Sequence, residues 1–369
     1  MKTVDLRFST QINDGLHETC ADGASLAFDT KYGIMFCAYM PGYHGDYGES
    51  RGKIHLSYFP ASQPTNIRYV EIARGDDVYV PNILGLGDGS VRVFYERYSR
   101  KDGDHAICFR DFDFITEELS AEKIVSVCRA DGTLSPLCLS EVNTYLEKNG
   151  YFDHVYRASE QMIFGGFTPF RDEDGYTYGA LPSELSEVVL FRSKDNMETV
   201  EFFAVYPRPV QYEFDYKILD GKIYALYRTN QKENGNTFAY SEDGGKTWSA
   251  PMDMEGSIQC RPRVSISGGK VVLCYNYFDD NSGNRPNVIM GRTAIRLCTM
   301  EKNEVKPLMD MHSKYGIVNV ALCDVLGDVY LAYSTSHSAL EYQNGTPYVR
   351  GKDAVRYISL GDLFEKEEA

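Results

Sequence analysis

The amino-acid sequence predicts an all-β chain folded as a six-bladed β-propeller, with a short helical insertion between blades 2 and 3. The first observation is an internal repeat, in which six segments combine a turn glycine with a short strand of alternating apolar and polar residues. The second is that five of these strands reach a tyrosine six residues after the glycine. The third is the spacing of the glycines, 56, 86, 46, 48 and 58 residues. Most of these intervals fit one blade of roughly 40–50 residues with its loop.

The repeat unit is a strand, a glycine turn and a second strand. The turn and second strand occupy Gly33–Tyr39, Gly89–Tyr95, Gly175–Leu181, Gly221–Tyr227, Gly269–Tyr275 and Gly327–Tyr333. Each unit supplies two of the four strands of a blade, so we expect residues 1–369 to form one propeller domain. A β-sandwich whose turn glycines recur by chance is the alternative, and the constant offset from glycine to tyrosine favours the propeller.

Two further segments complete this architecture. The 86-residue interval requires an insertion, and Ser140–Lys148 has the pattern of a short helix that ends before Gly150. We expect the strands Val4–Ser9 and Ala354–Leu360 to close the ring by sharing a blade.

The composition restricts the partners. The chain has 38 basic and 53 acidic residues and a net charge of −15, which argues against nucleic acids and anionic membranes. A small anionic ligand remains compatible if arginines are gathered locally. Several of the nine cysteines lie in apolar runs, among them Cys37, Cys274 and Cys323, and we expect buried, reduced thiols. Since the cysteine and histidine spacing suggests no metal site, we expect no cofactor.

The amino-terminal residues 1–11 contain no apolar stretch typical of a signal peptide, and no window reaches membrane-spanning length. We therefore expect a cytoplasmic chain without membrane insertion. A secreted or periplasmic protein whose signal peptide has been removed is the alternative.

Residues Ser241–Trp248 match the Asp-box pattern Ser-x-Asp-x-Gly-x-x-Trp. Asp243 can accept hydrogen bonds from backbone amides of its own turn, the glycines allow positive φ, and Trp248 packs beneath. A weaker copy covers Ser193–Thr199. We interpret the motif as structural, joining the third and fourth strands of a blade.

Propeller geometry places the start of each first strand and the end of each second strand at one mouth of the central channel. Polar residues at these positions include Glu96, Glu213, Arg228 and Arg261. Loops after the second strands add His44, Asp46, Arg51, Arg97 and Arg285. A polar set converging on one mouth predicts a ligand site, and loops rich in tyrosine and charge suit sugars. Solvated strand ends are the alternative interpretation.

The run from Tyr212 to Arg228, with Glu213, Leu-Asp-Gly and the following Asp-box, resembles the sialidase superfamily. Sialidases use a tyrosine nucleophile activated by a glutamate, an aspartate acid/base, and three arginines that clamp the substrate carboxylate. The resemblance implies Glu213 as the activating glutamate and Arg228 and Arg285 as the second and third arginines. Tyr315 lies near the nucleophile position, and Asp46 lies in the loop of the acid/base aspartate.

The chain departs from this pattern at the first arginine of the clamp, which is missing. Sialidases begin blade 1 with Arg-Ile-Pro, whereas this chain has Cys-Ala-Asp-Gly-Ala-Ser-Leu from Cys20 to Leu26. Arg51 or Arg261 could take its place, with His44, Glu96 and Arg97 as further substrate-binding candidates. The sequence thus predicts an exo-acting glycoside hydrolase for a terminal, acidic sugar of a glycan. A polysaccharide lyase on uronate glycans and a non-catalytic glycan-binding propeller are the alternatives.

Overall fold

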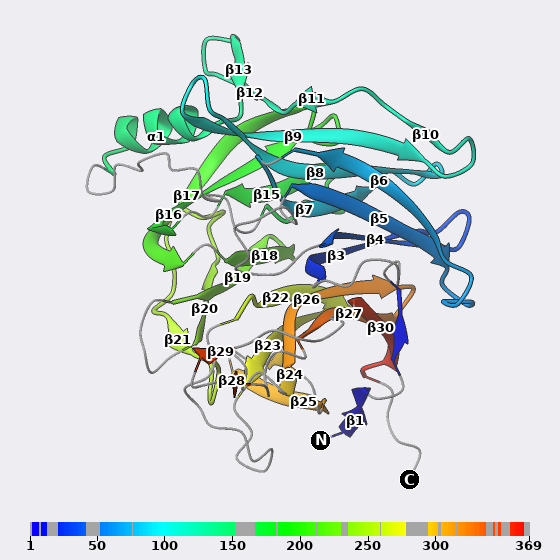
Figure 1. Ribbon diagram of the computed structural model, residues 1–369. Coiled ribbons are helices and arrows are strands. Elements are labelled where there is room, and N and C mark those ends of the chain that lie inside the picture. The colour runs from blue at the N-terminus through cyan, green and yellow to red at the C-terminus, as the bar shows by residue number, and fades with distance from the viewer. Residues whose placement is uncertain are drawn as a thin grey trace.

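The computed structural model describes residues 2–6, 9–12, 21–41, 52–75, 77–151, 167–181, 184–211, 213–229, 235–258, 260–277, 294–301, 304–313, 316–336, 342–343, 346–347 and 355–364. Within these residues, six mainly antiparallel sheets stand in a ring around a central axis (Figure 1). The prediction of a six-bladed, almost entirely β propeller is confirmed.

Each blade begins with an inner strand and continues outward. Blade 1 consists of β3 (Ala21–Asp29), β4 (Ile34–Pro41), β5 (Lys53–Pro60) and β6 (Arg68–Arg74). Blade 2 consists of β7 (Val78–Gly85), β8 (Ser90–Ser99), β9 (Asp104–Asp113) and β10 (Glu118–Leu119), and β11 (Lys123–Ile124) also pairs with β9. Blade 3 consists of β14 (Phe170–Arg171), β15 (Thr177–Leu181), β16 (Glu184–Ser193) and β17 (Thr199–Gln211), extended outward by β12 (Ser126–Cys128) and β13 (Leu134–Pro136).

The remaining three blades follow the same plan. Blade 4 consists of β18 (Phe214–Leu219), β19 (Lys222–Arg228), β20 (Asn236–Ser241) and β21 (Met252–Asp253). Blade 5 consists of β22 (Arg263–Ser267), β23 (Lys270–Tyr277), β24 (Ala294–Glu301) and β25 (Glu304–His312). Blade 6 consists of β26 (Gly316–Val325), β27 (Asp328–Ser336) and β30 (Val355–Asp362). A separate short hairpin joins β28 (Tyr342–Gln343) to β29 (Thr346–Pro347).

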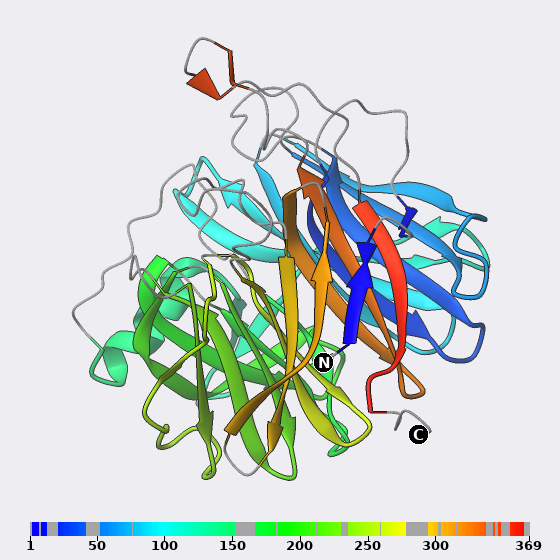
Figure 2. The same ribbon diagram turned by 90° about the horizontal axis from the view of Figure 1, so that it is seen from below.

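The amino-terminal segment closes the ring differently from the expectation. Strand β1 (Lys2–Asp5) pairs in parallel with β25 of blade 5, and β2 (Thr10–Gln11) pairs antiparallel with β30 of blade 6. Figure 2 shows β1 beside β25, with β30 on its other side. The segment therefore bridges two blades, whereas the sequence suggested that Val4–Ser9 shares one blade with the late strand.

The helical insertion lies between blades 2 and 3, as predicted. It is α1 (Leu139–Lys148), and its buried residues Leu139, Val142 and Leu146 pack into the apolar cluster between these two blades. The helix thus extends an existing core and forms no separate unit among the described residues.

The repeated glycine and tyrosine have separate structural reasons. The six turn glycines have φ between 67° and 100°, a left-handed backbone that residues with a Cβ rarely adopt. The tyrosines of blades 1, 2, 4, 5 and 6 are almost fully buried. Each one lies in the apolar cluster that its blade shares with the preceding blade. The repeat therefore marks the contact between neighbouring blades, which is where the core lies.

The turn at Ser241–Trp248 has the hydrogen bonds expected of its residue types. Asp243 Oδ1 accepts the backbone N–H of Thr247 at 2.8 Å, and Ser241 Oγ accepts that of Gly245 at 2.8 Å. The ring of Trp248 packs edge-on against Tyr206, with 4.8 Å between the ring centroids.

The weaker copy at Ser193–Thr199 has the same pattern. Asp195 Oδ1 accepts the N–H of Thr199 at 2.9 Å, and Ser193 Oγ accepts that of Met197 at 2.9 Å. Asn196 and Met197 hold positive φ there without a glycine. Both turns join the third and fourth strands of their blades, as predicted.

Candidate ligand site at the channel mouth

Glu213 and Arg228 form an ion pair where β18 begins and β19 ends. The backbone N–H of Arg228 donates to the carbonyl oxygen of Glu213 at 2.9 Å, and its Nη1 donates to Glu213 Oε2 at 3.3 Å. Their side chains are 15% and 20% exposed for Glu213 and Arg228 respectively. The two residues are brought together because β18 and β19 form a tight hairpin in which Phe214 opposes Tyr227. The structure thus joins two predicted site residues at one end of the channel.

Asp215 lies on the same strand, two residues deeper in the channel, and is 2% exposed. Its Oδ1 accepts from Thr168 Oγ1 at 3.0 Å and from Lys217 Nζ at 3.3 Å. Its Oδ2 accepts the backbone N–H of Val264 at 2.9 Å. Since these donors come from blades 3, 4 and 5, the buried carboxylate ties three inner segments together.

Arg261 spans the channel. Its Nη2 donates to Asn82 Oδ1 at 3.2 Å, and the two residues are 3% and 1% exposed. Arg261 precedes the inner strand of blade 5, and Asn82 lies on the inner strand of blade 2, on the opposite side of the ring. The predicted mouth residue Arg261 therefore forms a bar across the channel.

Three inner strands are irregular near this mouth. The pairing register shifts between Asp22 and Ser25 in β3, between Tyr79 and Asn82 in β7, and between Val318 and Ala321 in β26. Within the last two shifts, Val80 has φ of 39° and Asn319 has φ of 51°. Positive φ is rare for a β-branched residue, and such bulges redirect side chains at the rims of sheets. In β7 the bulge immediately precedes Asn82.

Arg263 is a functional candidate that the sequence analysis missed. It is 5% exposed, and its Nε donates to the carbonyl oxygen of Val320 at 2.8 Å. Burial lowers the pKa of Arg263, while the carboxylates of Asp215 and Glu213 act in the opposite direction. Strand alternation could have revealed it, because a residue two positions after Arg261 faces the same way.

The channel therefore concentrates positive charge in an acidic chain. Arg228, Arg261, Arg263 and Lys217 stand around the carboxylates of Glu213 and Asp215. Burial lowers the pKa of Lys217, and Asp215 opposes this effect. With Asp324, which also lines the channel, the described residues place four cationic side chains against three carboxylates, and this excess of one positive charge favours an anionic ligand. This local balance is opposite in sign to the net charge of −15.

Glu96 and Arg97 belong to contacts within blade 2. Glu96 is 1% exposed and pairs with Nδ1 of the fully buried His105. Arg97 Nη1 contacts Asp77 Oδ1 at 3.1 Å, and its Nη2 contacts Glu122 Oε2 at 2.6 Å. These ion pairs tie both residues to their own blade and its edge. The other candidates, His44, Asp46, Arg51, Arg285 and Tyr315, lie outside the described residues.

Other features of the described residues bear on function. In the ranges given above, no group of three or more His, Cys, Asp and Glu residues is arranged to hold a metal ion. Cys37 and Cys274 are buried and Cys323 is partly buried, and all three are free thiols. No helix in the described part of the chain is long and apolar enough to cross a membrane.

Comparison with known proteins identifies the fold. No protein-family model matches the sequence, and no curated protein is significantly similar to it. The Hadza microbial sialidase Hz136 superposes with a TM-score of 0.63 at 12% identity, covering 96% of this chain and 68% of that one. Trypanosoma rangeli sialidase, in complex with sialic acid, has a TM-score of 0.57 at 10% identity, over 97% of this chain and 59% of that one.

The chain has the fold of the sialidases. A protein of unknown function from Dyadobacter fermentans shares it over similar lengths, with a TM-score of 0.61, 13% identity and coverage of 95% and 96%. The chain spans less than two thirds of the T. rangeli enzyme. At these identities the likeness concerns the sialidase-like propeller itself, and the chemistry has to be argued from the residues at its mouth.

Proposed function

We propose that this sialidase-like propeller is an exo-acting glycoside hydrolase that removes a terminal acidic sugar from a glycan. The observation that carries the proposal is the Glu213–Arg228 pair, which the hairpin of blade 4 holds at the mouth of a positively charged channel. An acidic sugar offers a carboxylate, which guanidinium groups bind with paired hydrogen bonds. Arg228 ends the second strand of blade 4, and Arg261 lies two residues before the inner strand of blade 5.

The reaction scheme follows the sialidase resemblance. Glu213 accepts the hydroxyl proton of Tyr315 while the tyrosine oxygen attacks the anomeric carbon. The glycosidic carbon–oxygen bond breaks, and Asp46 donates a proton to the departing oxygen. Water then attacks the anomeric carbon and breaks its bond to the tyrosine oxygen. Asp46 takes the proton that the water loses, and Glu213 returns its proton to the tyrosine. General-base assistance of this kind contributes roughly 10²–10⁴ in rate. Arg285 is the proposed third arginine of the clamp.

A second candidate is a glycan-binding propeller that has lost the chemistry. It is favoured by the absence of an arginine between Cys20 and Leu26, where sialidases have the first arginine of the clamp. The ion pair of Glu213 with Arg228 would then serve only to shape the mouth.

A panel of aryl glycosides that includes a sialoside and uronides tests the proposal. Release of the aryl group from one member, followed by absorbance, is the expected result. Ultraviolet absorbance gained on uronate polysaccharides would identify a lyase instead. Saturable binding of the same sugars without turnover would identify the glycan-binding propeller and overturn the hydrolase.

A further inference from the structure

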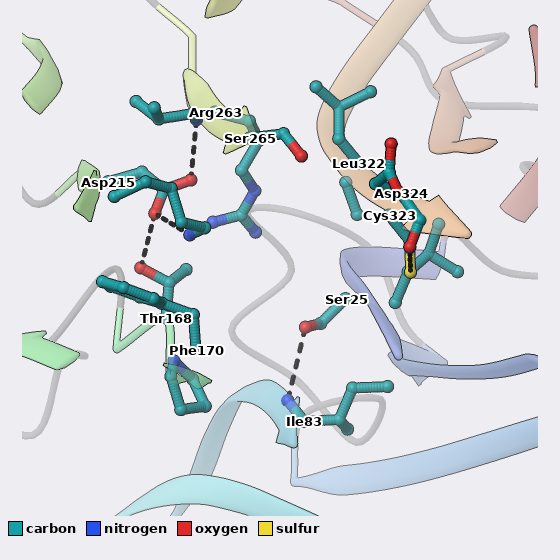
Figure 3. Close-up of a pocket in the computed structure, with 15 residues that line it drawn as sticks. Ser25, Ile83, Thr168, Phe170, Asp215, Arg263, Ser265, Leu322, Cys323 and Asp324 are labelled. Atoms are coloured by element: carbon teal, nitrogen blue, oxygen red, sulfur yellow. Dashed lines mark hydrogen bonds and ion pairs between the residues drawn. The ribbon is translucent and has the colours of Figure 1, made fainter. Parts of the chain in front are cut away.

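A cavity of about 190 Å³ occupies the channel on the far side of the Arg261–Asn82 bar from the mouth. Its lining comes from the inner segments of all six blades, and it includes neither Glu213 nor Arg228. Figure 3 shows Asp215, Thr168 and Arg263 on one side of the cavity and Cys323 and Asp324 across from them.

The cavity is closed toward the mouth and opens on the opposite face. Its lining residues nearer the mouth, among them Ser25, Thr168 and Arg263, are at most 8% exposed. Those nearer the glycine turns, such as Lys217 and Asp324, are partly exposed. The cavity therefore has its own entrance, remote from the site at the mouth.

Among the described residues, Arg263 has free hydrogen-bond donors at the closed end of the cavity. Within the described part of the chain, its Nε–H has a partner, the Val320 carbonyl, and its Nη1 and Nη2 groups have none. Asp215 is near enough to act on Arg263 electrostatically but has no hydrogen bond to it among the described residues, and its oxygens accept from Thr168, Lys217 and the N–H of Val264. A buried guanidinium requires a counter-charge or hydrogen-bond acceptors.

The other groups nearby complete a site for an oxyanion. Ser265 also lines the cavity, is 7% exposed, and its hydroxyl has no partner among the described residues. Lys217 stands near Arg263 and adds a second positive charge. A planar guanidinium fork, a hydroxyl and an ammonium group are the donors that carboxylates and phosphates require.

We propose that the rear of the channel binds a small oxyanion, a phosphate, sulfate or short carboxylate, with Arg263 as its principal ligand and Ser265 beside it. The ligand enters from the face of the glycine turns. Because it contacts segments of several blades, its binding stabilises the closed ring. This site is independent of the proposed hydrolase and of any substrate at the mouth.

The test measures binding of radiolabelled inorganic phosphate by equilibrium dialysis, at an ionic strength fixed with sodium chloride. All proteins in the test also carry Arg228→Met, which removes a cation from the mouth. The phosphate binding that remains is then attributed to the rear of the channel. Competition by sulfate and by acetate distinguishes the tetrahedral oxyanions from a carboxylate. Saturable binding of about one phosphate per chain is expected.

Two variants assign that binding to Arg263. Arg263→Met should weaken phosphate binding at least about tenfold, the loss expected for charged hydrogen bonds. Arg110→Gln is the matched control, because among the described residues Arg110 also donates to backbone carbonyls alone, those of Ser120 and Ile72, and it lies on β9. It should bind phosphate like the parent.

Asp324→Asn keeps the test decisive if Arg263→Met does not fold. Asp324 places a negative charge at the open end of the cavity, and its Oδ1 accepts the N–H of Gly327 at 3.1 Å. Removing this charge should tighten phosphate binding severalfold, because a repulsive charge is lost. The inference is overturned if the parent shows no saturable binding, if Arg263→Met binds equally well, or if Asp324→Asn fails to bind more tightly.

Discussion

Arg261 and Asn82 connect opposite blades of the ring, with 3.2 Å between Nη2 and Oδ1. The contact separates the channel into a mouth, where Glu213 meets Arg228, and the rear cavity that contains Arg263. This side-chain pair in the centre of the propeller thus links two opposite blades and also divides the channel into two sites.

Asn82→Ala should destabilise the propeller by about 1–3 kcal/mol, because it removes an acceptor from a buried guanidinium. Urea denaturation followed by tyrosine fluorescence measures the change in the free energy of unfolding. Asn66→Ala, in an exposed turn, is the control and should be near neutral. Equal stability of the Asn82 and Asn66 variants would show that the bar across the channel is dispensable.

Glu213→Gln should fold normally and lose turnover by roughly 10²–10⁴ on a substrate found with the glycoside panel. The amide retains the size of the carboxylate and an oxygen acceptor, but it cannot take a proton from a tyrosine. The measurement is kcat/KM together with a melting curve.

Glu201→Gln is the matched control for this variant, since Glu201 also pairs with an arginine, Arg192, at 2.6 Å, but on an outer strand. It should retain full activity. Full activity of Glu213→Gln itself would reduce Glu213 to a structural partner of Arg228.

Asp243→Ala should destabilise the chain in a pH-dependent manner. Hydrogen bonds from Thr247 lower the pKa of Asp243 to about 2, below the value of about 3.9 for an unfolded aspartate. A carboxylate with a lowered pKa contributes stability above its unfolded pKa and loses it as the pH falls toward the folded value. The stability difference between wild type and Asp243→Ala should therefore be larger at pH 6 than at pH 3.

Urea denaturation at the two pH values measures this difference. Glu242→Ala, at the neighbouring position, removes an exposed carboxylate that pairs with Lys222 on the surface. It should have little effect at pH 6. A stability difference for Asp243→Ala that is unchanged between pH 6 and pH 3 would contradict the assigned role of the Thr247 hydrogen bonds.

Gly245→Ala should be more harmful than Gly244→Ala, although both glycines have positive φ, 88° and 72° respectively. A Cβ at residue 245 would lie 2.7 Å from the Cβ of Ala204, whereas a Cβ at residue 244 would meet nothing within 4 Å. We expect about 1–2 kcal/mol for Gly244→Ala from the backbone alone, and a larger loss for Gly245→Ala. Comparable melting temperatures would show that the turn moves away from β17.

Local patterns in the sequence predicted most of the fold. The glycine turns, the tyrosines and the helix at Ser140–Lys148 depend on short-range rules, and the structure has them where those rules place them. The Glu213–Arg228 contact could also be predicted from the sequence, because a hairpin fixes the register of its two strands.

Contacts between segments far apart in the sequence could not be predicted in the same way. Arg261 meets Asn82 across 179 residues of chain, and nothing in either segment marks the other. The position of Glu96 and Arg97 predicted them as mouth residues, and no local pattern indicates their ion pairs with His105, Asp77 and Glu122. The parallel pairing of β1 with β25 depends on where the ring closes, which no local pattern specifies.

The bridging of blades 5 and 6 by β1 and β2 has a consequence for biosynthesis. Among the described strands β1 and β2 precede all others, yet β25 and β30, with which they pair, are synthesised only after blades 1 to 4. Until then the two amino-terminal strands present unpaired edges that can join other chains. The ring therefore closes as a late, non-local step, and such steps are slow and prone to aggregation.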